Sequence, residues 1–122
     1  MKKKIVIALG GNALLQRGDI LSAENQQRSI KAFAKMVAAL ASDYQPIIVY
    51  GNGPQVGLLA LQNAAYTDSP AWPLDILVAE SQGMIGASIA QDLTHHVQTV
   101  PVSTLMTRVE VDARDPAFAL PG

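Results

Sequence analysis

Apolar residues in the first fifty positions follow spacings that predict a strand, a helix and a second strand. Residues 5–9 form a continuous apolar run with β-branched members, bounded by lysines and glycine, as expected of a strand buried on both faces. Between 22 and 41, apolar side chains recur at helical spacing behind Ser22, a good N-cap residue. A second apolar run, 47–50, completes a β-α-β unit, whose two strands should be parallel.

The middle of the chain repeats the helical signal twice. Residues 54–65 begin with proline, which suits the first turn of a helix, and continue with the apolar residues Val56, Leu58, Leu59 and Leu61. Residues 74–94 are apolar over most of the helical circumference, which predicts a helix covered on more than one side. Because glycine lowers helix propensity by about 1 kcal/mol, we expect Gly83 and Gly86 inside this helix to be points of close packing.

The remaining segments complete the expected order of elements. Residues 97–100 and 102–111 are typical of strands, with partial alternation of valine and polar residues. Residues 12–21, around Gly18, are typical of a loop, and residues 112–122 of turns. The predicted order is β-α-β-α-α-β, which indicates an α/β sandwich.

Composition limits the class of protein. The chain has 122 residues, of which 49% are hydrophobic and 16% charged, and this suits one α/β domain with its own core. A net charge of −1 leaves no basic face beyond the lysines at 2–4, so we expect no nucleic-acid partner. No apolar run reaches the length of a membrane span, so we expect no membrane partner. The absence of cysteine excludes disulfides and thiolate chemistry and suits a reducing cytoplasm.

Candidate chemistry lies in two glycine turns, each directly after a predicted strand. Gly10-Gly11-Asn12 follows the first strand, and Gly51-Asn52-Gly53 follows the second and opens a helix. Backbone N–H groups at a helix start lack intrahelical partners and can hold an anion. Ligands of parallel sheets collect at the carboxyl ends of the strands. We therefore expect the two turns to converge on one phosphate-bearing substrate.

Other functional interpretations have less support. A dinucleotide site needs an acidic residue at the end of the next strand, whereas Asp75 lies at the start of a predicted helix. No glycine turn is followed by lysine and serine or threonine, which excludes a P-loop. His95 and His96 are adjacent at a helix end and so point in different directions, which disfavours metal binding. Ser81 and Ser103 lack a histidine and acid at a recognisable spacing.

Two anion-binding turns without an acid, base or nucleophile suit phosphoryl transfer, whose catalysis is mostly positioning and charge neutralisation. Cations are in short supply, however. The lysines at 2–4 lie at the opposite end of the first strand, and Lys31 and Lys35 lie on a helix. No lysine follows Lys35. We therefore expect most of the cations that a phosphoryl group needs to lie outside this chain.

Four strings, in order along nearly the whole chain, carry a resemblance to a known family. They are Ala8-Leu9-Gly10-Gly11-Asn12-Ala13-Leu14, Gly51-Asn52-Gly53-Pro54-Gln55-Val56-Gly57, Pro73-Leu74-Asp75 and Ser81-Gln82-Gly83-Met84-Ile85-Gly86. In these strings the sequence resembles the carbamate kinases of the amino acid kinase family. The resemblance implies an amino-acid-kinase-like α/β fold, a three-layer sandwich with a mostly parallel central sheet, incomplete in this chain. It also implies reversible transfer between ATP and carbamate, giving ADP and carbamoyl phosphate, with Mg²⁺.

The resemblance assigns roles by position. The residues that would meet the transferred phosphoryl group, and so be catalytic, are Gly10, Gly11 and Asn12. The residues that would hold carbamate or the carbamoyl end of the product are Gly51, Asn52 and Gly53. Carbamate is already an anion with a nucleophilic oxygen, so this reaction needs no general base. The family's subunits also pair, which implies a homodimer with part of the helix 74–94 at the interface.

The sequence departs from the family in two positions and in length. Tyr50 stands where the family usually has histidine, and Ala87 where an aromatic residue is common, which bears on substrate fit. Residues 1–122 would form a single N-terminal carbamate- and phosphate-binding domain, with the nucleotide-binding C-terminal domain absent and the isolated chain inactive. Two alternatives stay open: a non-catalytic amino-acid-kinase-like fragment that binds a small anion or partner subunit, and a sister kinase acting on another acid.

Overall fold

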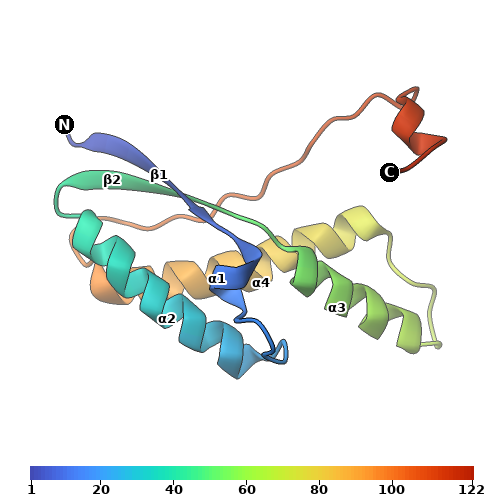
Figure 1. The fold of residues 1–122 in the computed structure, drawn as a ribbon, viewed down its shortest axis with the longest axis horizontal. Coiled ribbons are helices and arrows are strands. Elements are labelled where there is room, and N and C mark those ends of the chain that lie inside the picture. The colour runs from blue at the N-terminus through green and yellow to red at the C-terminus, as the bar shows by residue number, and fades with distance from the viewer.

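The structure is a computed structural model that describes the backbone of all 122 residues and every side chain except that of Asn12. Its elements are β1 (Lys3–Leu9), α1 (Gly11–Leu14), α2 (Ala23–Leu40), β2 (Tyr44–Tyr50), α3 (Gly53–Ala65), α4 (Leu74–His96) and a 3-10 helix η1 (Pro116–Phe118). Figure 1 shows the two strands beside each other above the long helices α2 and α4, with α3 extending beyond the ends of the strands. No helix in the described part of the chain is long and apolar enough to cross a membrane.

The β-α-β unit predicted from the first fifty residues is confirmed. Strands β1 and β2 are parallel, with Lys3 opposite Tyr44 and Leu9 opposite Tyr50. The helix between them starts as the sequence predicts, because Ser22 is the N-cap of α2 and its hydroxyl accepts from the backbone N–H of Asn25 at 3.2 Å. Both strands therefore end at the same edge of the sheet, which is where the two glycine turns lie.

The core lies between the inner face of the sheet and the helices α2 and α4. Its buried side chains come from the end of β1, from α1 and from one face of each long helix: Leu9, Leu14, Ile30, Phe33, Ala34, Val37, Ile85, Ile89 and Leu93. The predicted apolar stripe of α2 supplies four of these residues, and α2 packs directly against α4. Helix α4 thus holds the sheet, α2 and α3 together, since α3 also packs on it.

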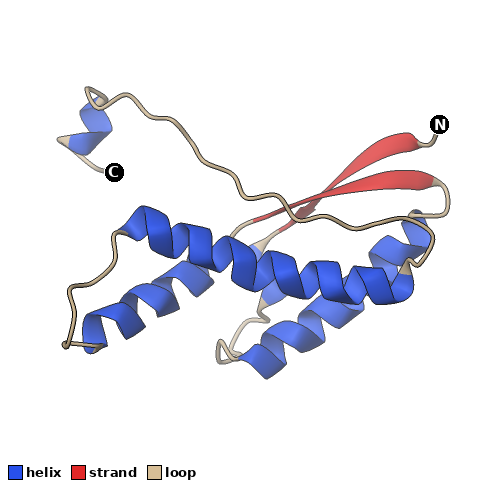
Figure 2. Cartoon of the chain, turned by 180° about the vertical axis from the view of Figure 1, so that it is seen from behind, coloured by secondary structure: helices blue, strands red, loops and turns tan.

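The outer face of the sheet is exposed, so the expectation of strands buried on both faces is wrong for this chain. Val6 is 66% exposed and Val49 54%, whereas Leu9 is buried. Both long helices lie on the same side of the sheet in Figures 1 and 2, and alternate strand residues have no cover. The described chain contains one helical layer on a parallel sheet, and not the second helical layer that the resemblance implies.

The segment after α4 does not form the predicted strand. Residues 97–112 carry no strand ladder, and the sheet has two strands. Side chains of α4 hold the segment instead: Gln82 Nε2 donates to the carbonyl of Thr107 at 3.1 Å, and Gln82 Oε1 accepts from the N–H of Thr107 at 2.9 Å. Alternation of valine and polar residues favours an extended chain, but a strand also needs a neighbouring backbone with which to pair.

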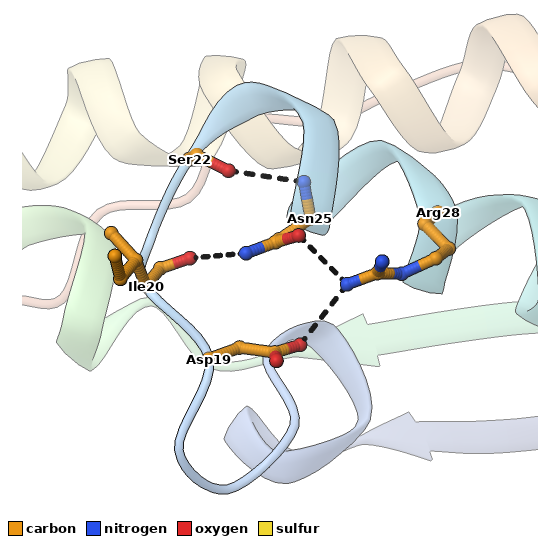
Figure 3. A network of polar contacts seen from close by, with 5 residues as sticks. All are labelled: Asp19, Ile20, Ser22, Asn25 and Arg28. Atoms are coloured by element: carbon orange, nitrogen blue, oxygen red, sulfur yellow. Dashed lines mark hydrogen bonds and ion pairs between the residues drawn. The ribbon is translucent and has the colours of Figure 1, made fainter.

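The loop between α1 and α2 is anchored to the start of α2. The expected loop from residue 12 is partly helical, since α1 covers Gly11–Leu14. As Figure 3 shows, Asn25 Nδ2 donates to the carbonyl of Ile20 at 2.8 Å, and Arg28 donates to Asn25 Oδ1 at 2.7 Å and to the Asp19 carboxylate at 3.3 Å. Gly18, at φ 92°, provides the left-handed residue of the turn before Asp19. These contacts fix the path of the chain away from the first glycine turn.

Candidate functional site

The first and second glycine turns begin side by side. Leu9 and Tyr50, the last residues of the two strands, are directly opposite each other, and the N–H of Gly51 donates to the carbonyl of Leu9 at 3.4 Å. Adjacent strands lie about 4.8 Å apart, so Gly10 and Gly51 leave the sheet at neighbouring points. The two turns therefore start side by side in the fold, and their convergence on one substrate stays a prediction.

The start of α3 has the features of an anion site. Gly53 and Pro54 are its first two residues, and Asn52 occupies the N-cap position. The first N–H groups of a helix have no intrahelical acceptor, and proline contributes none, which leaves the N–H groups of Gly53 and Gln55. The Asn52 side chain accepts no capping hydrogen bond from this turn, although asparagine is among the best N-caps. The helix start is thus left open toward the neighbouring glycine turn.

The Asn52 side chain is instead directed to α4. Its Nδ2 donates to Ser81 Oγ at 2.7 Å, and Ser81 Oγ donates to the carbonyl of Val78 at 2.7 Å. Ser81 is fully buried, with no exposed surface, while Asn52 is half-buried. A buried serine on a neighbouring helix therefore fixes the amide of the residue that the sequence assigns to substrate binding.

The glycines of both turns border open space. At Gly10, Gly11, Gly51 and Gly53, a Cβ atom would meet no described atom within 4 Å. Among the described glycines, only Gly18 has a positive φ. The backbone conformations of these four therefore do not require glycine. Neither packing nor backbone geometry in the free chain explains them, whereas close approach of a ligand to the backbone does. The side chain of Asn12, the third predicted catalytic residue, lies outside the described part of the chain.

Tyr50, the first departure from the family pattern, is tied to α4. Its hydroxyl donates to the carbonyl of Gln82 at 2.9 Å, and burial raises the pKa of the Tyr50 phenol above its ordinary value. A Cβ on Gly86 would collide with Tyr50 Oη and with the side chain of Thr104. The predicted close packing is therefore confirmed at Gly86. It is wrong at Gly83, where a Cβ would meet no described atom within 4 Å.

Two buried glutamines join α3 to α2 beneath the second turn. Gln55 is 1% exposed and Gln26 6%, and Gln55 Nε2 donates to Gln26 Oε1 at 3.2 Å. The other amide oxygen, Gln55 Oε1, accepts no hydrogen bond from the described atoms. Buried amides are costly unless paired, so this contact fixes the first turn of α3 at a definite place on α2.

Several cations of the chain lie away from the turns or are already paired. The lysines at 2–4 lie at the start of β1, opposite its glycine end, and Lys2 Nζ donates to the carbonyl of Ala41 at 2.6 Å, after the last turn of α2. Arg28 pairs with Asp19 at 3.3 Å. These four cations are therefore not placed to serve the turns, where the first N–H groups of α3 are available as donors. The expectation that most phosphoryl-binding cations lie outside this chain stays a prediction.

The carboxylates do not gather into a metal site. Among the described residues, no three histidine, aspartate or glutamate side chains lie together in a way that could hold a metal ion. Asp92 accepts from Gln27 Nε2 at 2.6 Å. Hydrogen bonds from the Arg114 side chain hold the pKa of Asp112 below its ordinary value, and Asp115 accepts from a backbone N–H of η1. The described side chains therefore offer no ready-made cluster of three ligands for Mg²⁺, an ion that proteins also bind through one or two carboxylates together with substrate phosphates.

A cavity of about 960 Å³ runs along β2 but is not centred on the turns. Its walls are β2, α4 and the segment after α4, and it reaches Tyr50 and Asn52 at one end and Lys2 at the other. Most of its lining is apolar, which suits neither a phosphate nor a carboxylate. The open space at the glycine turns is a better candidate for a small anion.

Comparison with known proteins assigns this arrangement to a family. The family model described as the amino acid kinase family matches residues 3–115. The chain belongs to the amino acid kinase family. Within this family it is 58% identical over 119 residues to a carbamate kinase of Escherichia coli and 54% identical over 119 residues to one of Haemophilus influenzae. These alignments cover 98% and 97% of this chain.

A solved amino acid kinase structure has the same fold. A carbamate kinase from Giardia lamblia bound to AMP-PNP superimposes with a TM-score of 0.88 at 36% identity, covering 98% of this chain and 44% of that one. The chain spans 40% of the Escherichia coli relative and 38% of the Haemophilus influenzae relative. The mixed α/β fold with a parallel sheet is thus that of an amino acid kinase, represented over less than half of its relatives' length.

Sequence reasoning missed two features of this candidate site. Ser81 was considered as a nucleophile and as part of a family string, and it was given no hydrogen-bonding role, although serine inside an apolar helix disfavours helix formation and calls for a local explanation. It gave no role to Gln26, which lies on the buried face of α2. A polar residue at a position that helical periodicity makes apolar is the signal that could have identified both. Ala87, the second departure from the family, is exposed on α4.

Proposed function

We propose that this chain is the carbamate-binding part of a carbamate kinase, a phosphotransferase that interconverts ATP and carbamate with ADP and carbamoyl phosphate. The observation that carries the proposal is the pair of glycine turns that leave β1 and β2 side by side. The carbamate kinases of Escherichia coli and Haemophilus influenzae match this chain at more than half of the aligned positions. That level of identity favours the same reaction for the protein to which the chain belongs.

In this proposal each turn holds one end of the substrate. The N–H groups of Gly53 and Gln55, with the Asn52 amide, bind the carbamate or carbamoyl end, and the positive end of α3 favours its negative charge. The first turn, with Gly10, Gly11 and Asn12, approaches the transferred phosphoryl group. Carbamate brings its own nucleophilic oxygen, so the residues of the chain bind and orient the substrate and need not remove a proton.

We infer that ATP or ADP and Mg²⁺ are the further components of the reaction. The Giardia lamblia relative is bound to AMP-PNP, a nucleotide analogue, which supports nucleotide use. Mg²⁺ would neutralise the charge of the phosphates when bound. Because the chain spans 40% of the Escherichia coli relative and 44% of the AMP-PNP-bound structure, we assign nucleotide and metal binding to a C-terminal domain that these relatives' remaining length would supply. Residues 1–122 are in this proposal a single N-terminal domain.

Calorimetry with carbamoyl phosphate on the 122-residue chain tests the binding role. Gly53→Ala places a methyl group in the open space at the start of α3, and we expect the association constant to fall about tenfold or more. Thermal stability should not fall, because the methyl group meets no described atom. Gly83→Ala is the matched control: it is also a glycine in a helix with open space around its Cβ, but it lies on α4, and it should bind normally.

The ligand series separates this function from its alternatives. Glutamate and UMP, tested in parallel, should give no heat above dilution. Tight binding of either one in place of carbamoyl phosphate would identify a sister kinase. Binding of inorganic phosphate alone, equal to that of carbamoyl phosphate, would instead indicate a non-catalytic small-anion site. Equal loss of binding in Gly53→Ala and Gly83→Ala would contradict the placement of the ligand at α3.

We also propose that the protein is a cytoplasmic homodimer whose interface includes part of α4 and the connection between α3 and α4. Large apolar side chains are exposed where α3 leads into α4: Leu61, Tyr66, Trp72, Leu74 and Ile76. Contiguous exposed apolar residues mark interaction surfaces. Light scattering at micromolar concentration should give a dimer, and Ile76→Glu should give a monomer. A monomeric mass for the unsubstituted chain would contradict the proposed homodimer.

The proposed location rests on composition. A chain without cysteine suits the reducing cytoplasm.

A further inference from the structure

The contact between Asn52 and Ser81 has a defined polarity. A hydroxyl group has one proton, and Ser81 Oγ lies 2.7 Å from the carbonyl oxygen of Val78, which can only accept. If Ser81 gave its proton to Asn52, two acceptors would face each other at that distance without a proton between them. Ser81 therefore accepts from Asn52, and the group that it accepts from must be the amide NH₂.

The polarity fixes which edge of the Asn52 amide is available to a ligand. Because the amide is planar and its Nδ2 is held by Ser81, Oδ1 lies on the other edge of the group. This oxygen does not cap α3, the alternative use of an N-cap asparagine. Ser81 is fully buried and its own proton is directed to the Val78 carbonyl, so it presents a fixed acceptor that orients the Asn52 amide in the free chain.

We propose that Ser81 is a specificity-determining positioning residue, which turns Asn52 Oδ1 toward the substrate so that it accepts from an N–H donor. The inference rests on the proposed function: of the two ends of a carbamoyl unit, only the amino group carries such protons. The N–H groups in the first turn of α3 bind the oxygen end of the carbamoyl unit, and Asn52 Oδ1 accepts a hydrogen bond from its amino end. An analogue in which methyl replaces the amino group loses one hydrogen bond and buries an unpaired oxygen.

The test compares three ligands on the 122-residue chain by calorimetry: carbamoyl phosphate, acetyl phosphate and inorganic phosphate. Acetyl phosphate has a methyl group where carbamoyl phosphate has its amino group. We expect the unsubstituted chain to prefer carbamoyl phosphate by about three- to tenfold. Ser81→Ala should reduce this ratio to about one while leaving the association constant for inorganic phosphate unchanged.

Ser88→Ala is the matched control variant. Ser88 lies two turns further along α4 and donates in the same way to a backbone carbonyl, that of Met84 at 3.1 Å. It should keep the full preference for carbamoyl phosphate. A readout independent of any ligand is the ¹⁵N-resolved signal of the Asn52 side-chain NH₂ group. In the unsubstituted chain, the proton that this group donates to Ser81 should exchange slowly with solvent. In Ser81→Ala the same proton should exchange rapidly.

The outcomes separate this inference from the proposed function. Carbamoyl phosphate binding with an unchanged ligand ratio in Ser81→Ala, or a fast-exchanging Asn52 amide in the unsubstituted chain, would overturn the role of Ser81 and leave the carbamate kinase proposal standing. If none of the three ligands binds the folded chain, the proposed function fails and this inference fails with it. A loss of all three ligands in Ser81→Ala alone would mean a purely structural role and would also overturn it.

Discussion

At the scale of single residues, the site depends on side chains that reach from one element to another. Tyr50 and Asn52 flank Gly51 and both bond to α4, the first to the carbonyl of Gln82 and the second to the hydroxyl of Ser81. The second glycine turn is thus held on both sides by contacts with one helix. A change at either contact should alter the turn before it alters the core.

Tyr50 provides a pH-dependent test of this contact. Burial raises the pKa of its phenol, so the folded chain favours the neutral form that donates to Gln82. The stabilisation is fully present below the unfolded pKa of about 10 and is lost as pH rises through the higher folded value. We expect the Tyr50 absorbance, obtained by subtracting the titration of Tyr50→Phe from that of the unsubstituted chain, to have a midpoint above about 10.

The same variant should show the linkage in stability. Above about pH 10, the unfolding free energy of the unsubstituted chain should fall more steeply with pH than that of Tyr50→Phe. At neutral pH, Tyr50→Phe should cost about 1 kcal/mol, because it leaves the Gln82 carbonyl without this donor. Parallel pH profiles for the two chains would show that the phenol is not held by α4.

The positions of these residues were only partly predictable from the sequence. The turns after 5–9 and 47–50 could be located because glycine follows an apolar run, and parallel pairing puts both at one edge. The orientation of Asn52 could not be predicted, because it depends on Ser81, twenty-nine positions away on another helix. A one-dimensional pattern identifies which residues are polar and does not identify which of them meet.

At the scale of elements, α4 is the helix against which the others are arranged. It packs against α2 and α3, and it holds the segment after it through the Gln82 side chain and the backbone carbonyl of Gly86, which accepts from the Thr104 hydroxyl. The apolar residues on the side of α4 that faces these elements are covered by them, whereas Leu74 and Ile76 remain exposed. The sequence predicted the helix well because 3.6-residue periodicity is a local property.

The two glycines of α4 should respond oppositely to the same substitution. Gly86→Ala drives a methyl group into Tyr50 and Thr104 and should destabilise the chain by about 1–3 kcal/mol. Gly83→Ala has open space and should stabilise the helix by up to about 1 kcal/mol, because alanine loses less backbone entropy. Urea unfolding of the two variants measures both effects. Similar stability changes of the same sign would contradict the close approach at Gly86.

At the scale of the whole molecule, the sheet has one covered and one open face. Val6 and Val49 are exposed on the open face, and residues 102–111 extend without a strand partner. The hydrophobic pattern predicted burial on both faces and a third strand, because such a pattern indicates which segments could pair in a sheet or be covered by other elements. It does not report whether that partner is present among the described residues.

The distribution of charge leads to the same view of function. Backbone N–H groups without intrahelical partners lie at the start of α3, after the carboxyl end of β2, while the lysines at 2–4 lie at the start of β1. Transfer of a phosphoryl group needs cations to neutralise developing charge. We therefore expect the isolated 122-residue chain to form no ATP from carbamoyl phosphate and ADP in a coupled assay.

A chimaera tests the central claim, that this chain supplies a working carbamate side of the site. Residues 1–122 would replace the matching part of the Escherichia coli relative, to which they are 58% identical. We predict that the chimaera forms ATP from carbamoyl phosphate and ADP at a rate within about tenfold of the relative's, and that Asn52→Ala in it lowers kcat by about a hundredfold or more. A folded chimaera without this activity, or an Asn52→Ala variant with unchanged kinetics, would contradict the account.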